Sequence, residues 1–327
     1  MDVDAPAKNR KFELARRPNP IELRRFAGTL SHSEQLAQVR VAHLTDQHVG
    51  RVTPLSVQRA AVELTNAQNP DLIALTGDFV CHSQAYLDQL GEVIAGFDAP
   101  VFAVLGNHDY WSGASEVRRV LHRAGAEILD NAHTTITIRG DKLQVLGLDD
   151  AYTGHADRRK ALKGLDRSAP TLGLSHIAEE ADGLWDAGVS LVLSGHTHAG
   201  QITLARLHEL AVGKIAGHKY VHGLYGCRSR QRADGAVYVG AGIGAAVMPL
   251  RIGERARREV ALFDLGHEPG SFDEHHDEQP AQPGRKPSMK TKLKRNLAVR
   301  KKHERREKRQ KRAEAREASK QKKNGKR

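Results

Sequence analysis

The chain has 327 residues, of which 39% are hydrophobic and 28% charged, and its formal net charge at pH 7 is +12. That charge is local, because residues 285–327 hold 21 of the 51 Lys and Arg but only 4 of the 39 Asp and Glu, a net charge of +17. Residues 1–284 therefore carry a net charge of −5, and the basic character of the whole chain says nothing about them. Two cysteines are too few for a disulfide framework.

Membrane and export signals are not found in the sequence. The first 20 residues contain no apolar segment of the kind that signal peptides carry. The uncharged run over residues 235–250 is Gly-rich and too short to cross a bilayer. We therefore expect a cytoplasmic protein without a transmembrane segment, which could still attach peripherally to a membrane.

Short apolar runs alternate with helical stretches from about residue 38 onward. Runs rich in Val, Leu and Ile and bounded by Gly predict buried strands over residues 39–44, 72–75, 101–105, 172–174 and 191–193. Helices are predicted between them over residues 55–68, 83–96, 115–124 and 179–187. Further β segments over 134–138, 143–148, 237–239 and 260–263 suggest a second sheet packed on the first. The alternation predicts an α/β fold.

Three units follow from these boundaries. Residues 1–37 are expected to form an N-terminal arm, residues 38–265 one folded domain, and residues 266–327 a polar and then strongly basic tail. The tail has almost no apolar residues to bury, so we expect it to be disordered or a solvated helix.

Polar clusters stand directly after the predicted strands, where open α/β sheets place their sites. Asp46 and His48 follow the first strand, and because side chains two apart on a strand share a face, they can share a cation. Gly77 and Asp78 follow the second strand. Taken singly, each has a simpler explanation, a surface loop for Asp46-x-His48 and a helix N-cap for Asp78.

The third cluster, residues 106–109, combines three chemical roles. The amide oxygen of Asn107 can bind a metal, and His108 can stay off the metal and act as an acid. Asp109 can orient that imidazole.

Three more histidines follow the later strands: His176 alone, and His196 and His198 as a pair two residues apart. Together the clusters predict seven metal ligands with nitrogen and oxygen donors and no thiolate. Seven ligands are too many for one tetrahedral ion, but they suit two ions that share a carboxylate and a bridging hydroxide. The donor set suits Mn²⁺, Fe or Zn²⁺, and we expect Mn²⁺ in vitro.

In this order the motifs resemble those of the calcineurin-like metallophosphoesterases. The resemblance spans about residues 38–265 and implies a four-layer fold, a β-sandwich of two sheets flanked by helices. It implies that Asp46, His48, Asp78 and His198 bind one metal and that Asp78, Asn107, His176 and His196 bind the other. His108 would protonate the leaving oxygen and be held by Asp109. Residues 147–150 and 223–225 are similar to a bacterial branch that includes UDP-2,3-diacylglucosamine hydrolases, although residues 177–180 differ from the Asn-Pro-Asp usual there.

The expected function is hydrolysis of a phosphodiester, a pyrophosphate or a phosphomonoester, with the diester favoured. The alternative is a metal-binding scaffold that acts mainly through its tail. For residues 285–327 three interpretations remain open: a solubilising tail without a partner, sequence-independent binding of nucleic acid, and attachment to an anionic membrane. A His108–Asp109 pair favours the enzyme, because a scaffold needs no general acid.

Overall fold

The computed structural model describes residues 21–81, 83–200, 217–229, 235–245, 251, 256–275 and 277–285. Of the basic tail it describes residues 288–291, 293–295, 297, 301, 304 and 305, all but the first of which are helical. Residues 1–20 of the expected arm and the last part of the tail, residues 306–327, lie outside the described residues.

The first sheet has six strands in the order β1-β12-β2-β3-β4-β5. They are β1 (Glu22–Ala27), β12 (Glu259–Asp264), β2 (Arg40–Leu44), β3 (Leu72–Thr76), β4 (Val101–Val104) and β5 (Ala126–Ile128). The strands from β2 to β5 are parallel, and β12 runs antiparallel to β2. Their crossovers are α3 (Leu55–Asn66), α4 (Leu87–Ala95) and the pair α5 (Asn107–Ser112) and α6 (Ala114–Arg123).

The second sheet also has six strands, in the order β10-β11-β9-β8-β7-β6. They are β10 (Gly223–Gly226), β11 (Ala236–Val239), β9 (Leu191–Ser194), β8 (Thr171–Ser175), β7 (Asp141–Leu148) and β6 (Ala132–Ile138). β7, β8, β9 and β11 are parallel, and the two outer strands pair antiparallel. Among the described residues, four short helices accompany this sheet: α7 (Arg158–Ala161), α8 (Ala181–Trp185) and the 3₁₀ turns η1 (Ala178–Glu180) and η2 (His198–Gly200).

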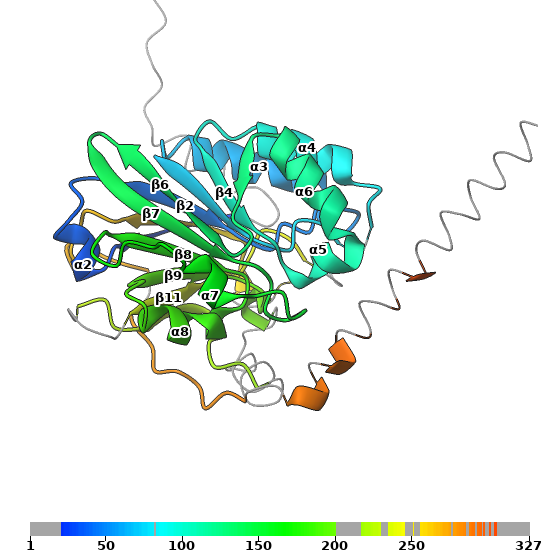
Figure 1. Ribbon diagram of the computed structural model, residues 1–327. Helices are drawn as coiled ribbons and strands as arrows, with labels where there is room; N and C mark the ends of the chain where they lie inside the picture. The colour runs from blue at the N-terminus through cyan, green and yellow to red at the C-terminus, as the bar shows by residue number, and fades with distance from the viewer. Residues whose placement is uncertain are drawn as a thin grey trace, which may run out of the picture.

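Four layers result from the way these elements bury their apolar faces. Side chains such as Phe26, Val104 and Leu174 fill the space between the two sheets. A second cluster joins the outer face of the first sheet to α3, α4 and α6, and a third joins the outer face of the second sheet to α7 and α8. Figure 1 shows these two groups of helices on opposite sides of the paired sheets. The central strands β3, β4, β8 and β9 are buried on both faces, which explains their continuous apolar runs.

The predicted fold class is confirmed, and the five strands that precede the polar clusters lie where the sequence predicts them. The expected arm is partly structured, however, because β1 pairs with β12 and α2 (Leu30–Ser33) follows it. Glu274 and Glu278, which lie beyond residue 265, form ion pairs with Arg228 of the folded body. We therefore propose that the folded body extends from about residue 21 to residue 285. Among the described residues no helix is both long and apolar enough to cross a membrane.

Candidate metal centre

The seven predicted ligands converge at one edge of the sandwich. Asp46, His48, Asp78 and Asn107 follow β2, β3 and β4 of the first sheet. His176, His196 and His198 follow β8 and β9 of the second sheet. Because parallel strands end at the same edge, two sheets packed face to face bring both groups of loops together.

The loops at this edge adopt unusual backbone conformations. Asp46, His48, Asp78, His196 and His198 all have φ between 43° and 76°, in the left-handed region. Non-Gly residues in this region cost on the order of 1–3 kcal/mol each and are found mostly at functional sites. Hydrogen bonds between the loops hold them there, among them Asp46 N–H to the carbonyl of Gly77 at 2.9 Å and His48 N–H to that of Asp78 at 2.9 Å.

Two glycines permit the close approach of the loops. Gly77 has φ +88°, and a Cβ added there would lie 2.6 Å from the backbone nitrogen of Gly106. A Cβ on Gly106 would lie 2.6 Å from the backbone nitrogen of Asp78. The Gly residues of both motifs are therefore needed to place Asp78 beside the β4–α5 loop.

The first group of ligand atoms belongs to Asp46, His48, Asp78 and His198. One atom from each lies within 4.8 Å of all the others. Nε2 of His48 is 3.0 Å from Nε2 of His198 and 3.6 Å from Oδ2 of Asp78. Nε2 of His198 is 3.3 Å from Oδ1 of Asp46. Imidazole nitrogens and carboxylate oxygens thus point at one small volume, as they do around a bound cation.

The second group consists of Asp78, His176 and His196, so Asp78 belongs to both. Nε2 of His176 is 3.4 Å from Oδ2 of Asp78 and 3.3 Å from Nδ1 of His196. Nδ1 of His176 is 2.7 Å from the carbonyl oxygen of Thr76. A proton on Nδ1 would bond that carbonyl and leave Nε2 to bind a metal, the usual arrangement of a metal-binding histidine.

Asn107 tests whether this group of residues suits a metal. Its side chain is 1% exposed, and no described group donates a hydrogen bond to its Oδ1. A buried amide oxygen without a donor costs about 1–3 kcal/mol, and a cation would remove that cost. With its Asp and His residues the site fits two divalent ions.

Electrostatics at the site also favour cations. Burial raises the pKa of Asp46 to about 7, and the carboxylate of Asp78 adds to that rise against the opposing effect of His176. Burial acts in the same direction on Asp78, but His176 and His108 hold its pKa well below the usual range. Burial, followed by His176, keeps the pKa of His196 well below its ordinary value. Burial lowers the pKa of His176, but the carboxylates of Asp78 and Asp46 raise it to about 10. Neutral imidazoles and ionised carboxylates are the forms that bind metals, so a cation bound here would displace the protons that Asp46 and His176 otherwise carry.

His108 lies at the side of the centre, with its side chain 12% exposed. Its Nε2 is 3.9 Å from Oδ2 of Asp78, and its ring centroid is 4.7 Å from those of His48 and Trp111. The imidazole therefore reaches the same space as the ligands while keeping contact with solvent.

Asp109, which the sequence predicts to orient His108, is surrounded by backbone amides. Its carboxylate accepts hydrogen bonds from four backbone N–H groups, those of Asp78, Phe79, Val80 and Gly106, at 2.8–3.3 Å. These bonds fill the roughly four lone-pair positions of a carboxylate. Asp109 thus joins the β3 loop to the start of α5, and this arrangement gives it a role in positioning Asp78.

Other residues near the centre were not predicted as site residues. Asp149, which follows β7, accepts hydrogen bonds from the hydroxyl of Tyr110 at 2.5 Å and from Arg118 at 3.2 Å, and so supports α5 and α6. Cys81 lies near His48 and His108. Residues 147–150 repeat the pattern of a polar cluster after a strand, and that signal in the sequence could have drawn attention to Asp149.

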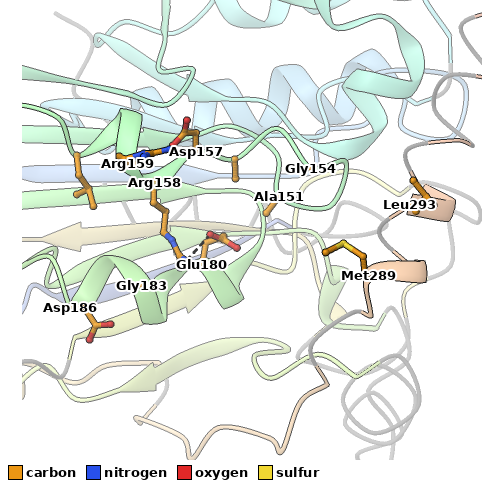
Figure 2. A pocket seen from close by; sticks show the side chains of 12 residues that line it. Ala151, Gly154, Asp157, Arg158, Arg159, Glu180, Gly183, Asp186, Met289 and Leu293 are labelled. Atoms are coloured by element: carbon orange, nitrogen blue, oxygen red, sulfur yellow. Dashed lines mark ion pairs between the residues drawn. The ribbon is translucent and has the colours of Figure 1, made fainter.

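A groove lies between the loop after β7 and the basic tail (Figure 2). Arg158 and Glu180, 3.7 Å apart, line one side, and Met289 and Leu293 of the tail face it from the other. Beside the groove, the ring centroid of Tyr152 is 5.2 Å from that of His196, and the guanidinium carbon of Arg295 is 3.8 Å from the Tyr152 ring centroid. The tail therefore reaches the rim of the metal centre.

Comparison with known proteins gives an independent view. Residues 39–200, which contain all seven predicted ligands, match the family model described as calcineurin-like phosphoesterase. The chain is 29% identical over 234 residues to an uncharacterized metallophosphoesterase, YkuE, of Bacillus subtilis, covering 69% of this chain and 78% of the relative. It is 29% identical over 240 residues to phosphodiesterase YaeI of Escherichia coli, covering 71% and 84%. A solved 5′-nucleotidase precursor from Thermus thermophilus is 13% identical with a TM-score of 0.45, covering 80% of this chain and 58% of that one.

Proposed function

This chain belongs to the calcineurin-like phosphoesterase family, and from that premise we propose that it is a dinuclear metal-dependent phosphodiesterase. Hydrolysis of phosphate esters is the chemistry of the family. The observation that carries the finer proposal is the meeting of two ligand groups at one shared carboxylate, that of Asp78. Both ligand groups lie within the range that the family model matches.

The proposed ligands divide between two ions. One ion takes Asp46, His48, Asp78 and His198, and the other takes Asp78, Asn107, His176 and His196. When bound, two such ions lower the pKa of a water molecule and neutralise charge on the phosphoryl oxygens. We propose Mn²⁺ for activity in vitro, since nitrogen and oxygen donors suit it.

His108 is the proposed general acid. Its partly exposed ring lies beside the ligands, where the leaving oxygen of a bound ester can approach it. Donation of its proton to that oxygen would avoid the release of a strongly basic alkoxide. This role favours an enzyme over a metal-binding scaffold, because a scaffold does not need a proton donor beside its ions.

A diester is the preferred substrate class for two reasons. A diester needs room for a second substituent next to the metals, and the groove beyond Tyr152 offers it. A relative that matches 71% of this chain is named a phosphodiesterase. The groove is lined by charged side chains of both signs, among them Arg158 and Glu180, and by apolar side chains such as Leu162, which suits a substituent with both polar and apolar surface.

Metal analysis tests the two-ion proposal. The full chain purified with Mn²⁺ should bind two ions, and the ratio of metal to protein should approach two. Asp78→Asn should lower occupancy at both positions, because this residue is the proposed bridge. An active wild-type protein with one ion or fewer would overturn the two-ion mechanism.

A substrate panel tests the diester preference. With Mn²⁺ present, bis(p-nitrophenyl) phosphate should be hydrolysed with a higher kcat/KM than p-nitrophenyl phosphate, and a UDP-linked lipid and a pyrophosphate complete the panel. Faster hydrolysis of the monoester would make the protein a phosphomonoesterase. No hydrolysis of any ester by protein with two bound ions would favour the scaffold.

The tail is proposed to bind polyanions. Residues 285–327 carry a net charge of +17 and contain no aromatic residue that could stack on bases. Binding through them would therefore depend on phosphate groups rather than on sequence, and would weaken steeply with salt. Polyanion binding of this kind fits the expected cytoplasmic location, and it would localise the protein independently of the reaction at its metal centre.

A further inference from the structure

Cys81 lies next to the metal centre, and the proposed reaction does not use it. It follows β3, three residues after Asp78, and its side chain is partly exposed. Its sulfur and one ring nitrogen from each of His48 and His108 lie within 4.8 Å of one another. These three residues, which we call the thiol cluster, form a third group of potential ligands beside the two that share Asp78.

The thiol cluster overlaps the catalytic residues. His48 also belongs to the group with Asp46 and His198, where its Nε2 is 3.0 Å from that of His198. His108 is the proposed general acid, and its ring centroid is 4.7 Å from that of His48. An ion held by the thiol cluster would therefore engage two side chains that the reaction needs.

The donor atoms of the thiol cluster differ from those of the catalytic groups. One sulfur and two imidazole nitrogens suit Zn²⁺, which binds thiolate at about 2.3 Å and imidazole at about 2.0–2.1 Å and accepts water as a fourth ligand. Mn²⁺ prefers oxygen donors and gains little from a thiolate. The thiol cluster would thus select between two metals that the catalytic groups accept alike.

We propose that His48, Cys81 and His108 form an inhibitory Zn²⁺ site. On binding, the thiol loses its proton to solvent and a Zn–S bond forms, with no change of oxidation state. The ion would withdraw His48 from the catalytic metal and hold the imidazole of His108, which the reaction needs as its proton donor. The inhibition rests on the proposed function, whereas binding of the ion does not.

Absorption spectroscopy with Co²⁺, a coloured substitute for Zn²⁺, tests the binding. Co²⁺ added to full-length, Mn²⁺-supplied protein should give a thiolate-to-metal charge-transfer band in the near ultraviolet. The band should persist in Cys227→Ser and be absent in Cys81→Ser. Cys227 is the matched control, because it is the only other cysteine. A missing band in the wild type, or a band that survives loss of Cys81, would overturn the site.

A chemical variant covers the case in which Cys81→Ser does not fold. Folded Cys227→Ser has Cys81 as its only thiol, so alkylation with iodoacetamide modifies that position alone. The alkylated protein should give no charge-transfer band. An undiminished band after complete alkylation, measured by mass, would refute thiolate ligation.

Enzyme assays test the inhibition. With Mn²⁺ saturating and each variant compared with its own rate without zinc, Cys81→Ser should raise the Zn²⁺ concentration for half-inhibition by at least about tenfold, the loss expected for a weakened metal site. Cys227→Ser should match the wild type. Equal inhibition of Cys81→Ser and wild type would remove the inhibitory role. A Cys81-dependent band in a protein that hydrolyses no ester would instead contradict the proposed function and leave the site standing.

Discussion

At the scale of single residues, His108 lies beside the two ligand groups that share Asp78 but belongs to neither of them. If it is the general acid and not a ligand, His108→Ala should leave the metal content near two and lower kcat by roughly 10²–10⁴-fold. The loss should shrink on a nitrophenyl ester, whose leaving group needs little protonation. Steady-state kinetics on good and poor leaving groups check this, and equal losses on both would assign His108 another role.

A substitution at Asp109 distinguishes between two roles of this residue, orienting His108 and holding the loop after β3. Its four backbone hydrogen bonds require acceptors at both oxygens. Asp109→Asn places an NH₂ group against backbone donors, so it should destabilise the protein by roughly 1–3 kcal/mol and reduce metal content along with activity. Denaturant unfolding and metal analysis measure both quantities. A variant with normal stability and two bound ions but low kcat would restore the orienting role.

At the scale of elements, a buried carboxylate joins the two sheets. Glu259 of β12 accepts hydrogen bonds from the hydroxyl of Tyr238 in β11 and from Ala241 N–H, both at 2.8 Å. It also pairs with Arg24 of β1 at 2.6 Å and His222 at 3.2 Å. Glu259→Gln should cost about 3–5 kcal/mol of unfolding free energy, because it leaves a buried guanidinium without its closest carboxylate.

Glu22 provides the control, since it also contacts Arg24, at 3.2 Å, but its side chain is 21% exposed. Glu22→Gln should cost less than about 1 kcal/mol, as exposed ion pairs do. If both substitutions cost the same, the burial of Glu259 does not decide its contribution.

The same carboxylate predicts a dependence of stability on pH. Burial alone would raise the pKa of Glu259, but His222 and Arg24 lower it below its ordinary value of 4.5. Because the pKa of Glu259 is lower in the folded than in the unfolded protein, its ionised carboxylate stabilises the fold fully at pH values above the unfolded pKa of 4.5. This stabilisation is lost as the pH falls from 4.5 toward the folded pKa. Wild type should therefore lose stability relative to Glu259→Gln on acidification below pH 4.5, and parallel losses would contradict this.

At the scale of the whole molecule, the basic tail and the acidic body carry opposite net charges, and among the described residues the tail contacts the body through Arg285 and Arg295. Arg295 lies over the ring of Tyr152, a cation–π contact worth about 0.5–1 kcal/mol. Truncation after Arg285 should therefore change kcat/KM on a small ester by only about two- to fivefold, the equivalent of that energy. The same truncation should abolish binding to RNA and to anionic vesicles.

Arg295→Ala in the full chain is the matched variant, because it should reproduce the change in kcat/KM while retaining most of the polyanion binding. Comparing RNA with vesicles at one ionic strength separates the two partner classes. Binding retained after truncation would place the basic surface on the folded body. A much larger loss of activity would mean that the tail contributes to catalysis itself.

The sequence by itself determined which side chains could bind metal and roughly where they would meet. Each candidate ligand follows a short apolar run, and strand ends are local signals that also fix the edge of the sheet. The pairing of β1 with β12 was not predicted, because a single strand far along the chain from its partner carries no local sign of that partner. For the same reason residues 22–27 were assigned to the arm.

Only the tertiary structure decided what the neighbours of each side chain are. Asp109 was expected to hold an imidazole because His108 is adjacent in sequence, yet its oxygens bind backbone amides some 30 residues away. Cys81 was not predicted as a metal ligand, because a single cysteine in the sequence does not indicate one. The fold places it beside two histidines from other loops. The residue type fixes the chemistry of each side chain. The partners of a carboxylate or a thiol depend instead on which loops pack together, and that packing is set by contacts between segments distant in the chain.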